Sequence, residues 1–391
     1  MKRLAFVVQR CGREVNGGSE KHCLDVARRL AGRADVEILT TCALDYWTWE
    51  NHYPPGLDTV DGVRVQRFPV ERPRDLAAFE ARSQRVRARL AAGDLDPAEA
   101  EAWMRAQGPW SPALLAHLRA HGGDYDAFFF FTYLYASTYF GLPEVEARAF
   151  LVPTAHDEWP IYLPIWERFF ARPRALLFNT PEERAFLQRR FPGLPLPGEV
   201  TGVGTDPPAR LDPDAFRRRF DLAGPFLLYV GRIEPAKGCD VLLDHYAHWR
   251  KGREDAPPLV LIGRSPAPLP PQPGVRALGF VDDQTKWDAL AACQALVMPS
   301  PAESLSMVLL EAWVAGRPAL VNAACDVLVA QTRRARGGLW YAAADEFAAA
   351  LDRLLEPRIA DVLGRQGQRW VQEAVSWERI LSTYLRLADS L

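Results

Sequence analysis

Short apolar runs alternate with longer amphipathic or charged segments along the chain. The runs are RLAFVV, DVEILTT, VRVQRF, AFFFFT, AFLVPT and ALLFNT in the first half, and FLLYVG, LVLIG, ALVMPS, PALVN and GLWY in the second. Continuous apolar runs are typical of strands buried on both faces of a parallel sheet, and the segments between them are long enough for crossover helices. The pattern therefore predicts an α/β protein.

A turn-rich segment separates the two sets of strands. Residues 198–214, GEVTGVGTDPPARLDPD, contain glycine, proline and aspartate in place of an apolar pattern. A chain of 391 residues also exceeds the size at which a single hydrophobic core usually splits into domains. We therefore expect a first domain over residues 1–200, a second domain over 201–372 and a closing segment over 373–391.

Two segments carry the signals of capped surface helices. Residues 71–107 are charged and helical in propensity, which favours a solvated helical hairpin over a binding arm. Its Asp94 and Asp96 precede a proline, a position typical of helix N-caps rather than of metal ligands. In FNTPEER, Thr180 is the expected N-cap, and Glu183 is expected to close a capping box.

Composition and charge exclude several classes of protein. The formal net charge of −2 gives no general attraction to nucleic acid or to anionic lipid, so an anionic ligand must be held by specific residues. The six cysteines contain no CxxC pair, as expected for reduced thiols in a cytosolic protein, and a structural zinc site is not expected. The first apolar run is too short for a signal peptide, and no later run is long enough to span a bilayer. We expect a cytoplasmic protein, with peripheral association at the inner face of the membrane left open.

The segment VGRIEPAKGCDVLL, residues 230–243, follows a predicted strand and places Arg232 and Lys237 between Gly231 and Gly238. Basic side chains at the carboxyl end of a strand, beside a helix N-terminus, suit a phosphate, because backbone amides and the helix dipole add to their charge. The alternative is a surface turn with two solvated cations.

The segment ESLSMVLLEAW contains two carboxylates, Glu303 and Glu311, eight positions apart on a mostly apolar stretch. We expect Glu303 at the entrance of a helix and Glu311 two turns inside it. Eight positions on a helix correspond to roughly 12 Å of rise, so an extended ligand could contact both where one partner atom could not. Glu311 in particular needs hydrogen-bond donors if it is buried.

Taken together, these motifs resemble those of the retaining glycosyltransferases of family 4, which have the GT-B fold. LLYVGRIEPAKGCDVLL, LGFVDDQTKWDALAACQALVMPS and the Glu-x7-Glu of ESLSMVLLE match the family in order and spacing. In the first domain, GGSEKHCLDVARRL matches the glycine-rich start of the first helix, and TAHDE occupies the place of the active-site histidine. The resemblance implies an α/β protein with two Rossmann-like domains facing across a cleft, and a C-terminal helix packing back on the first domain.

The resemblance also implies a role for each candidate residue. Glu311 would accept hydrogen bonds from the ribose of a nucleotide-diphosphate sugar, and Glu303 would face hydroxyls of the transferred sugar. Arg232 and Lys237 would neutralise charge on the departing diphosphate, so that no metal or other cofactor is required. The implied catalytic residues are Arg232, Lys237, Glu303 and His156, and the implied donor-binding residues are Gly17, Gly18, Gly231, Phe280, Val281, Ser304, Leu305, Ser306 and Glu311.

Several of these residues also have a simpler interpretation. Gly17 and Gly18 fit a tight turn, and the backbone of Phe280-Val281, expected to recognise the base, fits an ordinary strand end. His156 fits a histidine bonded within a loop.

The expected activity is transfer of a sugar, with retention of anomeric configuration, from a nucleotide-diphosphate sugar to a hydroxyl acceptor in glycan, glycolipid or other glycoconjugate synthesis. The acceptor is expected to be a saccharide, a lipid-linked sugar or another alcohol, bound by loops of the first domain. Trp47 and Trp49 either stack on its sugar ring or anchor their loop.

Two other functions stay open. A nucleotide-sugar epimerase uses the same fold and the same donors. A nucleotide-sugar-binding protein without turnover would suit the departure at Leu305-Ser306, where many family members have Phe-Gly.

Overall fold

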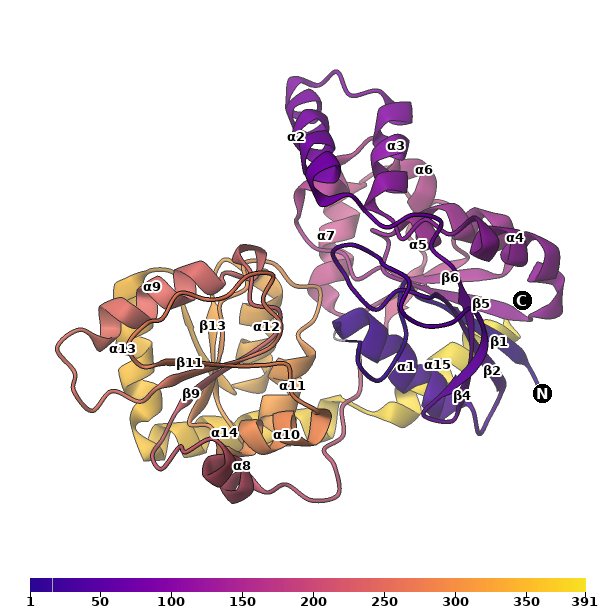
Figure 1. The fold of residues 1–391 in the computed structure, drawn as a ribbon. Helices are drawn as coiled ribbons and strands as arrows, with labels where there is room; N and C mark the ends of the chain where they lie inside the picture. Colours follow the sequence, from indigo (N-terminus) through magenta and orange to yellow (C-terminus); the bar gives the residue numbers. More distant parts are fainter. Residues whose placement is uncertain (16) are drawn as a thin grey trace. The chain divides into compact units, whose positions relative to one another are not determined.

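The computed structural model describes residues 1–15 and 17–391, which divide into two compact units (Figure 1). The first unit comprises Met1–Gly202 and Trp377–Leu391, and the second comprises Val203–Ser376. The sequence placed the boundaries at 200/201 and 372/373, within a few residues of these positions. Each of the strands expected from the apolar runs is present.

The first unit is built on an eight-stranded sheet with the order β3-β4-β2-β1-β5-β6-β7-β8. Its strands are β1 (Arg3–Val7), β2 (Asp35–Thr41), β3 (Gly56–Val60), β4 (Val63–Phe68), β5 (Ala127–Phe131), β6 (Ala149–Val152), β7 (Ala175–Phe178) and β8 (Gly198–Val200). The neighbouring pairs are parallel except for the antiparallel β3–β4 hairpin at one edge. Strand β8 lies in the segment for which only turns were predicted.

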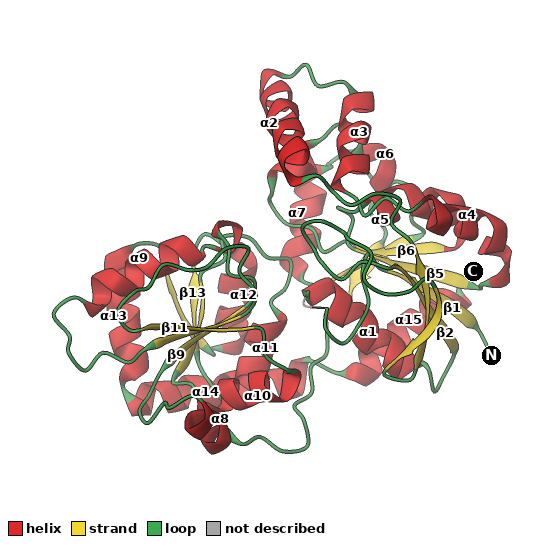
Figure 2. Ribbon diagram, viewed as in Figure 1, coloured by secondary structure: helices red, strands yellow, loops and turns green. Residues whose placement is uncertain are grey.

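Helices cover both faces of this sheet (Figure 2). They are α1 (Gly18–Leu30), α2 (Leu76–Ala92), α3 (Pro97–Gln107), α4 (Pro112–His121), α5 (Ala136–Gly141), α6 (Trp166–Phe170), α7 (Pro181–Arg190) and α15 (Trp377–Asp389). Helices α2 and α3 run side by side as the expected helical hairpin (Figure 1). The side chain of Asp96 accepts a hydrogen bond from Ala98 N, which confirms the N-cap of α3.

The C-terminal helix α15 packs against the sheet of the first unit, as expected. Its Ile380, Leu381 and Tyr384 are buried in one cluster with residues of β1, β5 and α1. The ring of Tyr384 lies 6.0 Å from that of Phe6 and 4.9 Å from that of Phe129. The last helix is therefore part of the core of the first unit, although the second unit separates it from that unit in sequence.

The second unit is built on a six-stranded sheet with the order β11-β10-β9-β12-β13-β14, in which the neighbouring pairs are parallel. Its strands are β9 (Leu227–Val230), β10 (Leu259–Ile262), β11 (Val275–Gly279), β12 (Ala295–Met298), β13 (Ala319–Asn322) and β14 (Gly338–Tyr341). Its helices are α8 (Pro213–Arg219), η4 (Pro235–Lys237), α9 (Cys239–Arg250), α10 (Asp283–Ala292), α11 (Met307–Val314), α12 (Asp326–Ala335), α13 (Ala344–Leu355) and α14 (Pro357–Ala374).

Two hydrophobic clusters of the second unit lie on opposite faces of its sheet. One joins the strands to α9 and α13, and the other joins them to α10, α11 and α12. Strand residues alternate between the two clusters, as Leu227 and Leu228 do. This arrangement leaves the loops at the carboxyl ends of the strands as the edge where ligands of such sheets usually bind.

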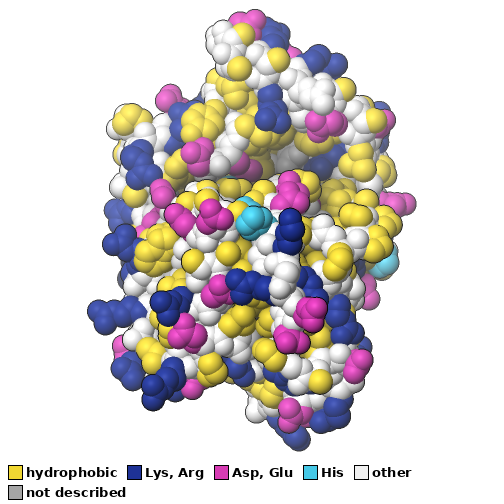
Figure 3. All heavy atoms as spheres, turned by 90° about the vertical axis from the view of Figure 1, so that its left-hand side faces the viewer, with side chains coloured by type: hydrophobic (Ala, Val, Ile, Leu, Met, Phe, Trp, Pro, Cys, Tyr) yellow, Lys and Arg dark blue, Asp and Glu magenta, His cyan; other side chains and the backbone are white. Residues whose placement is uncertain are grey.

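The surface shows no extended area of one charge on the face seen in Figure 3, where acidic and basic side chains are interspersed. This agrees with the formal net charge of −2. Across residues 1–15 and 17–391, no helix combines the length and the apolar character needed to cross a membrane.

Candidate functional site

The loop after β9 depends on two glycines. Gly231 has φ 158°, and a Cβ there would lie 2.7 Å from Oη of Tyr229, which donates a hydrogen bond to the carbonyl of Arg232. Gly238 has φ 71°, and a Cβ there would lie 2.5 Å from the carbonyl oxygen of Pro299. A side chain at either position would clash in a backbone conformation that few residues adopt. The two glycines therefore fix the path of the loop between them.

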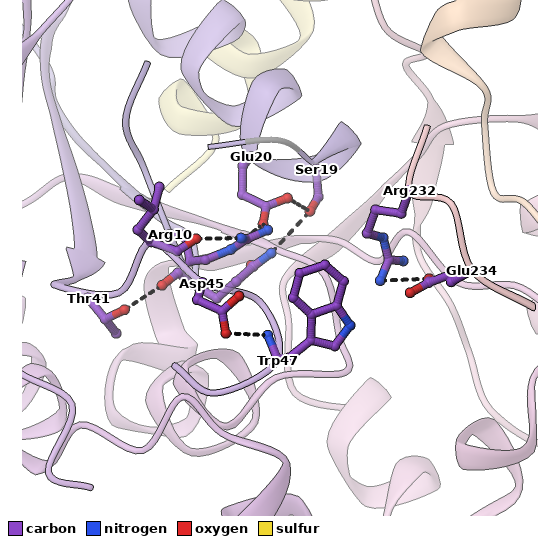
Figure 4. A network of polar contacts seen from close by, with 10 residues as sticks. Arg10, Ser19, Glu20, Thr41, Asp45, Trp47, Arg232 and Glu234 are labelled. Carbon is purple, nitrogen blue, oxygen red and sulfur yellow. Dashed lines mark hydrogen bonds and ion pairs between the residues drawn. The ribbon is translucent and has the colours of Figure 1, made fainter. Parts of the chain in front are cut away.

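Arg232 and Lys237 on this loop are each paired with a carboxylate of the second unit. Nη1 of Arg232 lies 2.9 Å from Oε1 of Glu234 (Figure 4). Nζ of Lys237 donates a hydrogen bond of 2.7 Å to Oε1 of Glu303. The two basic side chains are 25% and 24% exposed, so they are not the freely solvated cations of the alternative interpretation. The structure thus brings three of the four expected catalytic residues, Arg232, Lys237 and Glu303, into the loops that follow two neighbouring strands, β9 and β12.

The helix that follows Glu303 begins later than the sequence suggested. Helix α11 starts at Met307, and the side chain of Ser306 caps it by accepting a hydrogen bond from Leu309 N. Serine side chains compete for backbone donors, which favours such a cap over continuation of the helix toward Glu303. Glu303 therefore lies on the preceding loop, and Glu311 lies about one turn inside the helix rather than two.

The buried carboxylate of Glu311 is held by Lys286, a residue that the sequence motifs did not indicate. Glu311 is 2% exposed, and Nζ of Lys286 on α10 donates a hydrogen bond of 2.7 Å to its Oε1. Nζ of Lys286 also lies 2.9 Å from Asp283. Burial alone would lower the pKa of Lys286, but the Glu311 and Asp283 carboxylates outweigh it and raise that pKa. The sequence did contain a signal for this pair. Lys286 stands beside the apolar positions of α10, and a lysine at such a position suggests a buried partner.

The remaining donor-binding candidates of the second unit lie on loops. Phe280 is 43% exposed and follows the end of β11, and the Arg264 guanidinium lies 5.2 Å from the centre of its ring. Val281 is half-buried between β11 and α10. Ser304 is buried and Leu305 half-buried on the loop that leads to α11. These positions follow the carboxyl ends of β11 and β12, at the same edge of the parallel sheet as the loop after β9 that carries the cations.

In the first unit, Gly17 makes room for a buried ion pair at the start of α1. A Cβ at Gly17 would lie 2.1 Å from Oε2 of Glu20, whereas a Cβ at Gly18 would meet nothing within 4 Å. Glu20 accepts hydrogen bonds from Arg10 and from Ser19 (Figure 4). Burial alone would raise the pKa of Glu20, but Arg10 and Ser19 outweigh it and lower that pKa. Gly17 has extended backbone rather than a tight turn, and its small size is required by Glu20.

His156 lies on the loop after β6. This loop is held in place by another buried carboxylate, that of Glu183. Nε2 of His156 is 3.6 Å from Oε1 of Glu158, and its Nδ1 is buried without a partner among the described residues. Next to it in sequence, Ala155 N donates a hydrogen bond of 2.6 Å to Glu183 at the start of α7, and so does Asn179 N. The side chain of Thr180 caps α7, as predicted. Glu183 therefore ties the loop of His156 to the helix of the next strand.

The two tryptophans proposed for the acceptor have different surroundings. Trp49 is 1% exposed, and its Nε1 donates a hydrogen bond of 2.7 Å to the Gln107 carbonyl. This favours a loop anchor over a stacking platform for Trp49. Trp47 is half-buried, and its backbone N–H is bound by Asp45 (Figure 4). Only Trp47 therefore offers part of its ring to a ligand.

The second domain matches a protein-family model. The model described as Glycosyl transferases group 1 matches residues 224–357, which include β9 to α13. A D-inositol 3-phosphate glycosyltransferase of Salinispora tropica is 30% identical to the chain, and the match covers 94% of this chain and 80% of that protein. The enzyme of the same name from Salinispora arenicola is 29% identical over 95% of this chain and 86% of its own.

Solved structures show the same fold over the whole chain. The sucrose-phosphate synthase of Thermosynechococcus elongatus has a TM-score of 0.75 at 17% identity and covers 100% of this chain and 99% of its own. The Anabaena protein HepE, in complex with UDP and glucose, has a TM-score of 0.69 at 16% identity, with both chains covered fully (100%).

These structural neighbours show that the two Rossmann-like units form the GT-B fold, as expected. The identity of 30% to a curated glycosyltransferase over 94% of this chain shows that the protein is a glycosyltransferase. It belongs to the group 1 glycosyltransferases.

Proposed function

We propose that the protein transfers a sugar from a nucleotide-diphosphate sugar to a hydroxyl group, with retention of anomeric configuration and without a metal ion. The observation that carries the proposal is the set of cations and carboxylates at the strand ends of the second unit. Arg232 and Lys237 lie on a glycine-bounded loop beside a helix N-terminus, where a diphosphate is well placed to be bound. The HepE structure with UDP and glucose supports a nucleotide-sugar donor.

In this proposal Glu303 and Glu311, which are each paired with a lysine, also bind hydroxyl groups of the ligand. Each carboxylate accepts a hydrogen bond from a ligand hydroxyl, either in place of its lysine contact or in addition to it. Glu311 accepts hydrogen bonds from the ribose hydroxyls while Lys286 holds its carboxylate in place. Glu303 faces hydroxyls of the transferred sugar. Lys237, released from part of its contact with Glu303, donates to the diphosphate together with Arg232. Both cations then stabilise the negative charge that develops as the donor is cleaved.

The proposed reaction breaks the bond between the anomeric carbon and the diphosphate oxygen. The acceptor oxygen forms a bond to the same face of that carbon, and its proton passes to the departing phosphate oxygen. No protein carboxylate is assigned as the nucleophile. In the part of the chain that the structure describes, no three His, Cys, Asp or Glu side chains are grouped so that they could hold a metal ion. Independence from metal stays a proposal, to be tested directly.

The test is a transfer assay with a panel of nucleotide sugars and acceptors. D-Inositol 3-phosphate belongs in the panel because the curated relatives are named for it. NMR of the product gives the anomeric configuration, and the assay is repeated with saturating chelator. Retention with undiminished activity is expected. An inverted product, or activity that returns only with a divalent ion, would overturn the proposed chemistry.

The same assay addresses the two alternatives left open by the sequence. An epimerase would convert a nucleotide sugar with no acceptor present. A binding protein would bind the donor tightly and release no nucleotide diphosphate with any acceptor. The group 1 family model and the curated relatives are all of glycosyltransferases, which supports transfer over both.

A further inference from the structure

A pocket of about 690 Å³ lies in the first unit, beside the hairpin of α2 and α3. Its walls come from both helices, from the segment that precedes α2, and from the loops that carry Trp49 and Trp110. The volume falls within the range of small-molecule sites. None of the residues implied by the family resemblance lies in it except Trp49. A binding arm was the alternative to a solvated hairpin for residues 71–107.

Four arginines line this pocket, and none of them has a carboxylate within ion-pair distance among the described residues. They are Arg72, Arg74, Arg82 and Arg105. On the same hairpin but outside the pocket, Arg89 pairs with Glu99 at 2.6 Å. Arg85 and Arg87 of the same hairpin also have no ion pair among the described residues, so what distinguishes this site is the grouping of four such arginines around one pocket.

The acidic residues of the lining do not neutralise these arginines by contact. Asp75 caps α2 by accepting a hydrogen bond of 3.0 Å from Ala78 N. Glu101 accepts a hydrogen bond of 2.9 Å from the Tyr139 hydroxyl. Glu71 is exposed. Two of the three carboxylates are therefore already committed to other donors.

Arg74 is the most buried of the four cations. Its guanidinium donates to the Gln107 carbonyl and lies 5.0 Å from the ring of Trp49 and 4.5 Å from that of Phe79. Its Nε is buried without a hydrogen-bond partner in the described part of the chain. Burial lowers the pKa of Arg74 to about 10. A desolvated guanidinium with an unused donor is satisfied best by an anion.

We propose that this pocket binds a phosphate monoester carried on a sugar or another polyol. The planar fork of arginine matches the oxygens of phosphate, and several arginines suit a doubly charged group. The half-buried rings of Phe79 and Trp110 offer apolar walls to the body of the ligand. Such a ligand could be the acceptor of the transfer or an effector that is not consumed. Binding itself is independent of the proposed function, whereas the acceptor role rests on it.

The binding test uses isothermal titration with inorganic phosphate, glucose 6-phosphate and uncharged glucose at low salt. The wild type should bind the two phosphates at millimolar concentration or below and should not bind glucose. Arg82→Gln and Arg74→Gln should each weaken binding about ten- to a hundredfold, since each removes a charge-assisted contact. The matched control is Arg85→Gln, because Arg85 lies on the same helix, is exposed, and is outside the pocket.

Arg74→Gln also removes the bond to Gln107 and could unfold the hairpin. Arg82→Gln therefore decides the outcome, because the Arg82 side chain makes no such bond within residues 1–15 and 17–391. Its melting temperature should equal that of the wild type. No binding of either phosphate by the wild type would overturn the proposal. Equal affinity in Arg82→Gln and the wild type, or an equal loss in Arg85→Gln, would also overturn it.

A second arm separates the two sources of the ligand. If glucose 6-phosphate receives a sugar and Arg82→Gln raises its KM, the pocket is an acceptor site. If it binds without being consumed, the pocket is an effector site; both results support the binding proposal. Release of nucleotide diphosphate from the donor alone reports on the proposed function separately. A protein that binds phosphate but never cleaves a donor would refute the function and keep the pocket.

Discussion

At the scale of single residues, Arg232 and Lys237 give the most direct test of the proposed donor site. Negative charge builds on the diphosphate as it leaves, so these cations should stabilise the transition state more than the ground state. A charge-assisted hydrogen bond contributes about 1.5–3 kcal/mol, so one alanine substitution should lower kcat by roughly ten- to a few hundredfold. The measurement is kcat at saturating donor and acceptor.

The control for these cations is Lys251→Ala, since Lys251 is an exposed residue at the C-terminal end of α9. Its kcat should equal that of the wild type. If the two cations act on the same oxygens, the double mutant should lose less than the product of the single effects. Wild-type kcat in both single mutants would remove the loop from the mechanism.

The two glutamates test which way the ligand lies. Glu311→Gln should weaken binding of the nucleotide diphosphate itself, whereas Glu303→Gln should mainly impair binding or transfer of the sugar. Calorimetry with nucleotide diphosphate and steady-state kinetics with the full donor distinguish the two effects. The reversed pattern would mean that the ligand is bound in the opposite direction.

Substitution of Lys286 serves as a control that distinguishes a purely structural role of Glu311 from a role in nucleotide binding. Removing one partner of a buried ion pair costs about 3–5 kcal/mol, because the other charge is left uncompensated. Lys286→Met should therefore destabilise the second unit, and adding Glu311→Gln should restore part of that loss. If Glu311→Gln changes stability but leaves nucleotide affinity intact, the pair serves only the fold.

At the scale of secondary-structure elements, burial of Glu183 makes the junction of β6 and α7 sensitive to pH. Burial raises the pKa of Glu183 from 4.5 to about 8, although the backbone N–H groups of Asn179 and Ala155 partly offset it. Between pH 4.5 and 8 the folded state therefore keeps a proton that the unfolded state has released. Stability should fall as pH rises through this range, by at most about 1.4 kcal/mol per pH unit for one proton.

Thermal melts of the wild type and Glu183→Gln across this range provide the measurement. The variant should have a smaller slope of melting temperature against pH, because it has no proton to release at this position. Its absolute stability should be lower at pH 5, since an amide cannot accept from two N–H groups as a carboxyl does. An unchanged slope would exclude Glu183 as the titrating group.

The elements also show what the sequence could predict. Each strand with a continuous apolar run was predicted, because both of its faces are buried. Strand β3 has exposed residues at Leu57, Asp58 and Thr59, and β8 is three residues long, so neither has that pattern. The candidate site was likewise predicted only where a local pattern in the sequence marks its residues. Motif spacing indicated Glu303 and Glu311, but their lysine partners depend on contacts between elements far apart in sequence.

At the scale of the whole molecule, each of the two units has its own core. The first unit is completed by α15, which follows the entire second unit in sequence. A chain with this connection cannot finish folding its first unit until its last residues are available. Damage to α15 should therefore affect the first unit and leave the second intact.

Tyr384 provides a clean test of this organisation. It is fully buried against Phe6 and Phe129, and its hydroxyl has no hydrogen-bond partner among the described residues. Tyr384→Ala should destabilise the first unit by about 3–5 kcal/mol, the usual cost of removing a large buried ring. Tyr384→Phe keeps the ring and removes the unsatisfied hydroxyl, so it should be neutral or stabilising. Hydrogen exchange resolved by segment measures both effects. In Tyr384→Ala, amides of β1 and β5 should exchange faster, while those of β9 and β12 keep wild-type protection. Equal loss of protection in both sets of strands would show that the two units unfold as one.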